Sequence, residues 1–142
     1  NREIDRGTFV QMIYDYLAVD REYTGLQQFL DINEEDPLYD KVHWFYDEEI
    51  IKGYSDGTFR PFQSLTRAEA VKIILAVKGI KAQKVDETLK DLFPDATSWE
   101  RPWVLEAHKL GLIKGYTDGT FRPAEFLTRA QAAKLIIESG VR

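Results

Sequence analysis

Cysteine is absent from the 142 residues, so the chain has no disulfide, no thiol nucleophile and no cysteine-ligated zinc. Long apolar runs are absent as well: short ones such as Leu135 to Ile137 fall far below the roughly 20 residues of a membrane-spanning helix. Basic residues are outnumbered, 19 against 24 acidic ones, and a net charge of -5 is the wrong sign for binding a phosphate backbone. We therefore expect no nucleic-acid partner and no membrane insertion.

Catalytic and metal-binding patterns are also missing. His43 and His108 occupy non-equivalent positions of the repeats described below, and no Gly-x-Ser-x-Gly or phosphate-binding Gly-Lys-Ser/Thr string occurs. We predict a non-enzymatic protein with no cofactor and no metal. Apolar residues nevertheless make up 44% of the chain, enough to close a modest core. The start at Asn1, without a basic and an apolar signal region, indicates a piece of a longer protein.

The sequence repeats itself at an interval of 62 residues. Residues 51–61 are IKGYSDGTFRP and residues 113–123 are IKGYTDGTFRP, and the match continues into the following segment. The opening residues 4–8 align with the start of that following segment, which indicates a third, truncated copy. The predicted domains are the closing helix of a truncated first repeat (1–20), a second repeat (21–80) and a third repeat (81–142).

Helices are predicted to begin at equivalent positions of the three copies. Thr66-x-x-Glu69 and Thr128-x-x-Gln131 are capping boxes, in which threonine accepts a backbone N–H and the Glu or Gln reaches back to the cap. Asp5 is expected to cap the corresponding first helix. Apolar residues recur at three- and four-residue steps behind each cap, so one face of each helix should be buried. Two further helices are expected over residues 39–49 and 100–110.

The nearly identical strings each contain an Asp-Gly pair, which suits a tight turn with the glycine at positive φ. Asp56 and Asp118 are then expected to bond the backbone ahead of them. A calcium loop is the alternative, although the oxygen ligands that an EF-hand spaces at alternate positions are absent. Phe59 and Phe121 are expected to hold each loop against the core.

Arg6, Arg67 and Arg129 each occupy the first position of an equivalent helix. A cation is disfavoured there because a helix N-terminus carries partial positive charge. Two explanations remain open. The arginines pair with a neighbouring acid such as Asp31 or Asp95, or they help to bind an anionic ligand, where a guanidinium and free helix amides converge on a carboxylate or phosphate.

The ordered set Phe-x-Asp, Trp, Gly-Leu-Ile-x-Gly-Tyr-x-Asp-Gly-Thr-Phe-x-Pro and Leu-Thr-Arg-Ala-Glu/Gln resembles the S-layer homology domain over residues 29–79 and 93–140. The resemblance implies an all-α fold of tandem helix-loop-helix repeats around a central three-helix bundle, a pseudo-threefold spindle. It also implies a module that anchors surface proteins to the bacterial envelope by binding pyruvylated cell-wall polysaccharide in grooves between repeats. The motif arginine contacts the anionic pyruvate ketal in that family.

Carried onto this sequence, the arginine role falls to Arg67 and Arg129, with Arg6 in a copy that has lost the threonine cap and the glutamate. An indole exposed at a groove would suit stacking on a sugar ring. The expected ligand-binding residues are Arg67, Arg129, Arg6, Trp99, Trp103, Tyr54, Tyr116, Gly53 and Gly115. We expect an extracellular location at the cell wall or S-layer. The alternative function is a protein-interaction or assembly module with other surface-layer proteins as partners, in which the same arginines pair with acids across an interface.

Overall fold

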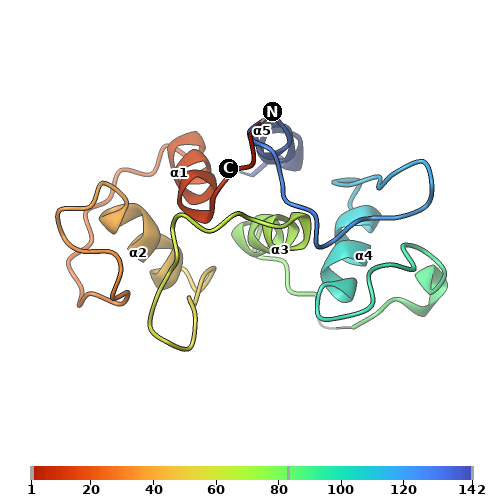
Figure 1. Ribbon diagram of the computed structural model, residues 1–142, viewed down its shortest axis with the longest axis horizontal. Coiled ribbons are helices and arrows are strands. Elements are labelled where there is room, and N and C mark those ends of the chain that lie inside the picture. The colour runs from red at the N-terminus through yellow and green to blue at the C-terminus, as the bar shows by residue number, and fades with distance from the viewer. Residues whose placement is uncertain (1, 83, 142) are drawn as a thin grey trace. The chain divides into compact units, whose positions relative to one another are not determined.

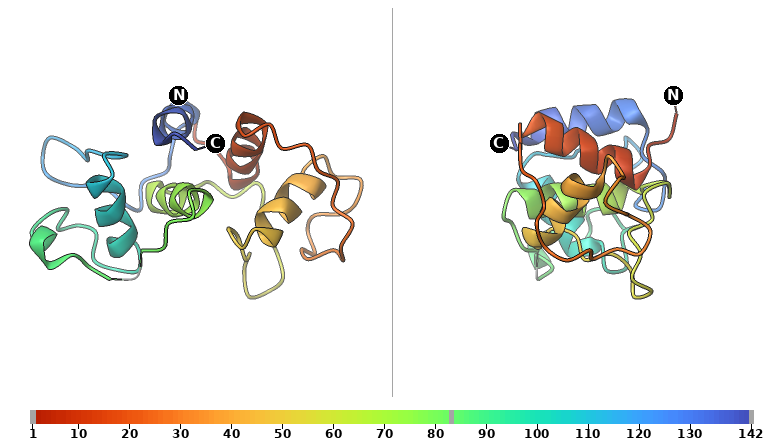
Figure 2. Two further views of the ribbon diagram at one scale, coloured as in Figure 1. Left: turned by 180° about the vertical axis from the view of Figure 1, so that it is seen from behind. Right: turned by 90° about the vertical axis from the view of Figure 1, so that its left-hand side faces the viewer.

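The computed structural model describes residues 2–82 and 84–141 (Figures 1 and 2). In this part of the chain there are α-helices, one short 3-10 helix and loops, with isolated β-bridges but no strands. The all-α prediction is confirmed. The chain packs as two compact units. We call Ile4–Ser64 the amino-terminal unit, and Leu65–Val141 together with the residues up to Glu3 the carboxy-terminal unit.

The amino-terminal unit pairs α1 (Arg6–Tyr16) with α2 (Tyr39–Asp47), red and orange in Figure 1. The Asp5 carboxylate accepts the Thr8 N–H at 2.7 Å, so α1 begins at the predicted cap. The second helix is two residues shorter than predicted, because Glu49 adopts a positive φ of 59° and leaves the helical path. The unit buries large apolar side chains from both helices and from the loops, among them Phe9, Ile13, Phe29, Phe45 and Phe59.

The carboxy-terminal unit contains α3 (Arg67–Val77), the 3-10 helix η1 (Glu87–Leu89), α4 (Arg101–Lys109) and α5 (Arg129–Ser139). Both predicted capping boxes are formed, at the starts of α3 and α5. The third helix contacts both α4 and α5. The buried core cluster of the carboxy-terminal unit consists of Val71, Leu75, Phe93, Ala96, Val104, Leu105, Ala107 and Phe121.

Each packing unit joins parts of two successive sequence repeats. The closing helix α1 of the first predicted repeat packs with α2 of the second, and α3 of the second packs with α4 of the third. The boundary between units therefore falls between Ser64 and Leu65, directly before a capped helix. As a result, the arginine at the start of one repeat's closing helix lies against the Gly-Tyr loop of the next repeat.

Candidate ligand-binding site

The loop over residues 115–122 is closed by its own backbone and side chains. The Tyr116 N–H donates to the Thr120 carbonyl at 2.8 Å, and the Gly119 N–H donates to the Tyr116 carbonyl at 3.0 Å. Asp118 accepts the Thr120 N–H at 3.0 Å and the Thr120 hydroxyl at 2.6 Å, as the Asp-Gly turn predicted. These hydrogen bonds, with the nearby Arg122, lower the pKa of the Asp118 carboxyl.

A second carboxylate fixes the end of the loop. Asp95 accepts the Phe121 N–H at 2.9 Å and the Arg122 N–H at 2.7 Å. Arg122 has a positive φ of 61°, an uncommon conformation that this double hydrogen bond holds in place. Asp95 is therefore used by the loop. One of the two alternatives from the sequence, an ion pair between Asp95 and an arginine at the first position of a helix, is not found among the described residues.

Arg67 lies across this loop. Its Nε donates to the Phe121 carbonyl at 3.0 Å, and its guanidinium carbon is 5.0 Å from the ring centre of Tyr116 and 4.7 Å from that of Phe121. The Phe121 ring is fully buried, so the loop is held to the core as predicted. Within residues 2–82 and 84–141, Arg67 forms no ion pair and donates no hydrogen bond from its terminal nitrogens. No carboxylate of the described residues pairs with its guanidinium, whose terminal nitrogens remain able to donate hydrogen bonds to an anion.

Arg6 repeats this arrangement in the amino-terminal unit. Its Nε donates to the Phe59 carbonyl at 3.0 Å, and its guanidinium carbon is 5.0 Å from the Tyr54 ring centre and 4.8 Å from that of Phe59. Arg6 is only 8% exposed, however, which makes it one of the few buried charged side chains of the described chain. The two units therefore hold their arginines in the same way but expose them differently.

Arg129 is not placed against a loop. Its backbone N–H donates to the Arg2 carbonyl at 3.0 Å, as the Arg67 N–H does to the Glu125 carbonyl at 2.8 Å. The side chain is exposed, and within the described part of the chain it has no hydrogen bond, ion pair or ring contact. The predicted arginines thus occupy three different environments.

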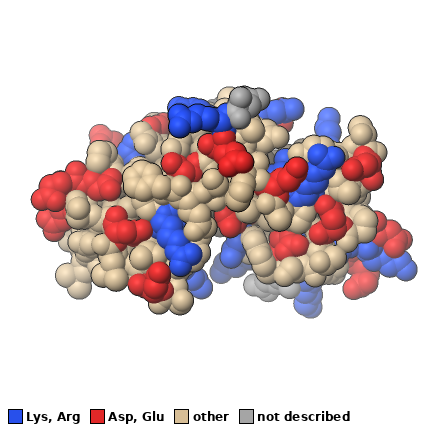
Figure 3. Space-filling model, viewed as in Figure 1, with Lys and Arg blue, Asp and Glu red and all other residues tan. Residues whose placement is uncertain are grey.

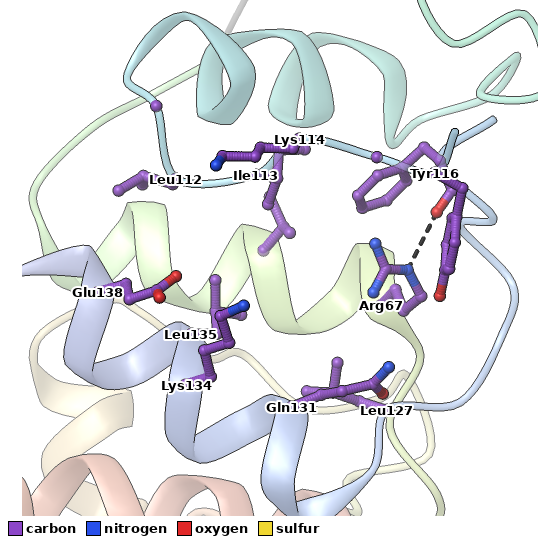
Figure 4. A pocket seen from close by; sticks show the side chains of 14 residues that line it. Arg67, Leu112, Ile113, Lys114, Tyr116, Leu127, Gln131, Lys134, Leu135 and Glu138 are labelled. Carbon is purple, nitrogen blue, oxygen red and sulfur yellow. Dashed lines mark hydrogen bonds between the residues drawn. The ribbon is translucent and has the colours of Figure 1, made fainter. Parts of the chain in front are cut away.

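The Arg67 guanidinium opens onto a hollow of about 370 Å³ between α3, α5 and the Gly-Tyr loop (Figure 4). The lining includes the apolar residues Val71, Leu112, Ile113 and Leu135. The charged lining residues are Arg67, Lys114, Lys134 and Glu138, three cations against one acid. Gly115 and Tyr116, both predicted site residues, also line the hollow. An anionic group with an apolar neighbour fits this lining.

Gly53 and Gly115 have a structural role that the sequence analysis did not predict. Both have positive φ, 78° and 75°, and a Cβ at either position would lie within 2.9 Å of a loop carbonyl, Thr58 or Thr120. The same Cβ would also strike the ring of Phe29 or Phe93. These glycines therefore let the loop backbone approach the core closely.

Trp99 and Trp103 lie outside the lining of the hollow. The Lys72 ammonium of α3 is 5.5 Å from the Trp99 ring centre and 5.6 Å from that of Trp103, so it makes cation–π contacts both with α4 and with the segment just before it. Trp99 is 49% exposed, and Trp103 packs partly against the core cluster. The structure brings the two indoles together but does not bring them to Arg67.

Sequence reasoning missed several lining residues. Lys114 and Lys134 were not singled out, and Gln131 was noted only as part of a capping box. Gln131 and Tyr116 also line a second hollow of about 400 Å³, together with Glu3, Ala124, Glu125, Phe126 and Thr128. One available signal was the exchange of Glu69 for Gln131 between otherwise matching motifs.

On the face drawn in Figure 3, acidic and basic side chains are interspersed. The described residues contain no group of three or more histidines, aspartates or glutamates arranged to hold a metal ion. None of the helices in residues 2–82 and 84–141 combines the length and the apolar character needed to cross a membrane.

The S-layer homology domain family matches residues 28–71 and 88–133, more than half of the chain. The chain belongs to this family, which confirms the predicted resemblance. It is 34% identical over 103 residues to the cellulosome-anchoring protein of Acetivibrio thermocellus, covering 69% of this chain and 22% of that protein. It is 30% identical to the S-layer protein sap of Bacillus anthracis, covering 70% of this chain and 12% of that protein.

A third relative is an enzyme. The chain is 32% identical over 142 residues to the amylopullulanase of Thermoanaerobacterium thermosulfurigenes, covering 96% of this chain but 7% of that protein. The matched part is thus a small fraction of each relative. Because the matched family is a non-catalytic anchoring module, the match confirms the prediction of a non-enzymatic segment. Together, the family and these relatives confirm the predicted location at the cell surface.

Proposed function

We propose that this cell-wall anchoring module binds an anionic, pyruvylated wall polysaccharide in the hollow beside Arg67. The observation that carries the proposal is the guanidinium itself. It lies at a helix N-terminus, it has no carboxylate partner among the described residues, and it opens onto a hollow large enough for a sugar residue. A guanidinium fork and a carboxylate form charge-assisted, bidentate hydrogen bonds. The pyruvate ketal supplies that carboxylate.

The rest of the lining suits the remainder of such a ligand. Ile113 and Leu135 offer an apolar surface to the ketal methyl group or to a sugar-ring face. Lys114 and Lys134 add positive charge, which raises the local concentration of an acidic polymer even though the chain as a whole is acidic.

The other predicted residues take different places in this proposal. Arg6 is the equivalent residue of the amino-terminal unit, with Tyr54 and Gly53 in place of Tyr116 and Gly115. Arg129 offers an exposed guanidinium to the same kind of anion. Because Trp99 and Trp103 lie outside the hollow, they would contact only sugars beyond the one that Arg67 holds.

The test is calorimetric titration with a pyruvylated wall-polymer fragment and with the same fragment after removal of pyruvate. Arg67→Ala should weaken binding about tenfold to hundredfold, because it removes charge-assisted hydrogen bonds. Arg67→Lys should retain only part of the wild-type affinity, since lysine keeps the positive charge but cannot form the bidentate hydrogen bonds of a guanidinium. Arg21→Ala is the matched control: it removes an exposed arginine of the other unit whose ion pair to Glu48 is long, at 3.8 Å.

Equal binding of both fragments, or unchanged binding by Arg67→Ala, would overturn the proposal. If Arg67→Ala instead binds the polymer normally but no longer associates with purified surface-layer protein, the assembly function replaces the polysaccharide one. A thermal melt of each variant separates lost binding from lost folding.

A further inference from the structure

The chain between α1 and α2 includes residues 21–28, a segment without helix or strand that we call the strap (Figure 1). The backbone of the strap is held by side chains of the two helices. Within the described residues these ties are hydrogen bonds of the Tyr14 hydroxyl with Arg21 at 3.1 Å, of Asp40 with the Tyr23 N–H at 2.8 Å and of His43 with the Gln28 N–H at 2.9 Å. Because most of the strap is exposed, its attachment depends on these few contacts.

The hydrogen bonds of His43 determine its protonation state. The side chain is fully buried, at 0% exposure. Its Nδ1 lies 2.7 Å from the Tyr39 carbonyl, which can only accept, so Nδ1 carries a hydrogen. Its Nε2 lies 2.9 Å from the Gln28 N–H, which can only donate, so Nε2 carries none. The closed strap therefore requires a neutral imidazole. A proton on Nε2 would set two donors against each other and break the tie to Gln28.

The surroundings of the imidazole are mainly aromatic. Its ring stacks on that of Tyr23 in the strap, with ring centres 4.3 Å apart, and lies at the same distance from the ring of Tyr39 in α2. Burial raises the pKa of the Tyr39 hydroxyl, and the charges of Glu34, Tyr23 and Asp40 add to the rise. The Asp40 carboxylate already accepts the Tyr23 N–H. In the described part of the chain, neither carboxylate is hydrogen-bonded to the imidazole.

We propose that His43 is an acid-sensitive tie: when its imidazole takes up a proton, the strap separates from α2 and the amino-terminal unit opens locally. A histidine in contact with water takes up its proton as the pH falls through about 6.5. The opened strap thus binds a proton that the closed strap excludes, so a falling pH favours the opened form. This inference concerns local stability and does not depend on the proposed ligand.

The segment before α4 should not share this sensitivity. Position 105 matches position 43 at the repeat interval of 62 residues, and it holds a buried leucine, Leu105. The segment is held instead by the Arg101 guanidinium, which donates to four backbone carbonyls. A guanidinium keeps its proton throughout the pH range in which proteins are folded. Acid therefore acts on one unit through a residue that the other unit does not have.

Opening of the strap should reach the loop of the amino-terminal unit that holds an arginine. The strap continues into Phe29 and Asp31, and the Asp31 carboxylate accepts the Phe59 N–H and the Arg60 N–H at 2.8 Å each. The Phe59 carbonyl in turn accepts the Nε of Arg6. A strap that has left α2 holds Asp31 less firmly, so this loop should loosen at a pH at which the loop beside Arg67 is unchanged.

The test is amide hydrogen exchange of wild type and His43→Gln between about pH 7.5 and about pH 5.5, with each rate divided by the intrinsic rate at that pH. In wild type, protection of the Gln28 amide should fall about tenfold, because uptake of one proton shifts the opening equilibrium up to about tenfold per pH unit below pH 6.5. In His43→Gln, the side-chain oxygen can accept the same N–H without titrating, so protection should stay constant. The Ala96 amide, in the segment held by Arg101, is the internal reference.

A second variant keeps the test decisive if His43→Gln does not fold. His43→Leu introduces the residue that the other unit has at this position and removes the acceptor of the Gln28 N–H. Its Gln28 amide should exchange rapidly, with a protection that does not depend on pH. Nitrogen NMR of wild type at neutral pH should show the Nδ1–H tautomer of His43.

Constant protection of the Gln28 amide in wild type across this pH range would overturn the proposal. A fall of the same size in His43→Gln would overturn it as well, because the titrating group would then be another one. The same holds if NMR shows a protonated His43 while the Gln28 amide remains protected, or if His43→Leu protects that amide as well as wild type does.

Discussion

The two Gly-Tyr loops have nearly the same geometry although they belong to different packing units. The arginine Nε to carbonyl distance is 3.0 Å in both, and the distances from guanidinium to the two rings agree within 0.1 Å. In each loop a second arginine, Arg60 or Arg122, stacks on the tyrosine at 3.7 Å and has a φ of 61°. A string that differs at one of eleven positions thus makes the same contacts to its arginines in both units.

The segments before α2 and α4 are held in unlike ways. In the amino-terminal unit, the buried His43 accepts the Gln28 N–H on Nε2 at 2.9 Å, which leaves Nδ1 to donate to the Tyr39 carbonyl at 2.7 Å. In the carboxy-terminal unit, the guanidinium of Arg101 holds the segment before α4. Arg101 donates to the carbonyls of Leu92, Phe93 and Ala96 from Nη1 and to that of Lys90 from Nη2.

This contrast separates two kinds of residue. The candidate site is built from residues that the repeats share. These are the loop string, its aspartates and the arginine at the start of the helix. Those that the repeats do not share, His43 and Arg101 among them, hold the segment that leads into the next helix. Substitutions of the shared residues should therefore have similar effects in the two units. Where the effects differ, the difference should reflect how exposed the substituted side chain is in each unit.

The largest expected effect comes from the glycines that precede the loop tyrosines. Gly53→Ala and Gly115→Ala should each lower the free energy of unfolding by about 2 to 4 kcal/mol, because a Cβ adds positive-φ strain and a clash with the core phenylalanine and a loop carbonyl. Urea denaturation measures this. Gly119→Ala is the control, with φ of 85° but open space around the added Cβ, and should cost about 1 kcal/mol. Equal losses at Gly115 and Gly119 would contradict the steric argument.

A smaller effect should distinguish the two arginines. Arg6→Ala removes a buried side chain and leaves the Phe59 carbonyl without its donor, which should cost about 1 to 3 kcal/mol. Arg67→Ala removes the same bond from a more exposed position, where water replaces the donor, and should cost about 1 kcal/mol or less. Thermal melts of the two variants test the ranking. A larger loss for Arg67→Ala would mean that exposure does not control the stability contribution.

The parts of the fold that sequence analysis predicted are those with local causes. The caps at Thr66 and Thr128 depend on residues three positions away, and the turns at Asp56 and Asp118 on residues two positions away. Short-range hydrogen bonds of this kind are determined by the residues themselves.

The missed features depend on packing between distant segments. The bond from Arg67 to Phe121 spans 54 residues, and the periodicity of neither helix predicts it. For the same reason the sequence did not show that Trp99 and Trp103 lie against Lys72 and away from Arg67.

The smallest expected effect is a loss of stability in acid that is shared by both loops. Hydrogen bonds from Thr58 and Thr120 lower the pKa of Asp56 and Asp118, and Arg60 and Arg122 add to the shift. A carboxyl whose pKa is lower in the folded state stabilises the fold above its unfolded pKa, about 3.9, and loses that contribution as the pH falls through the folded value. The free energy of unfolding should therefore decline below about pH 4.

The carboxy-terminal unit should show an additional loss, because Asp86 also has a lowered pKa, from hydrogen bonds with Thr88 and from the Lys109 ammonium at 3.3 Å. Urea denaturation between pH 7 and pH 3, followed by Trp103 fluorescence in a Trp44→Phe, Trp99→Phe background, measures this unit. Asp86→Asn and Asp118→Asn should each flatten the decline, whereas Asp56→Asn should flatten it less in this signal because it acts in the other unit. The hydrogen bond to Asp86 also raises the pKa of Lys109. The stabilisation that Lys109 contributes is therefore lost as the pH rises through the raised pKa of Lys109. A decline that none of the three asparagine variants changes would place the acid sensitivity outside the loops and the Asp86 pair.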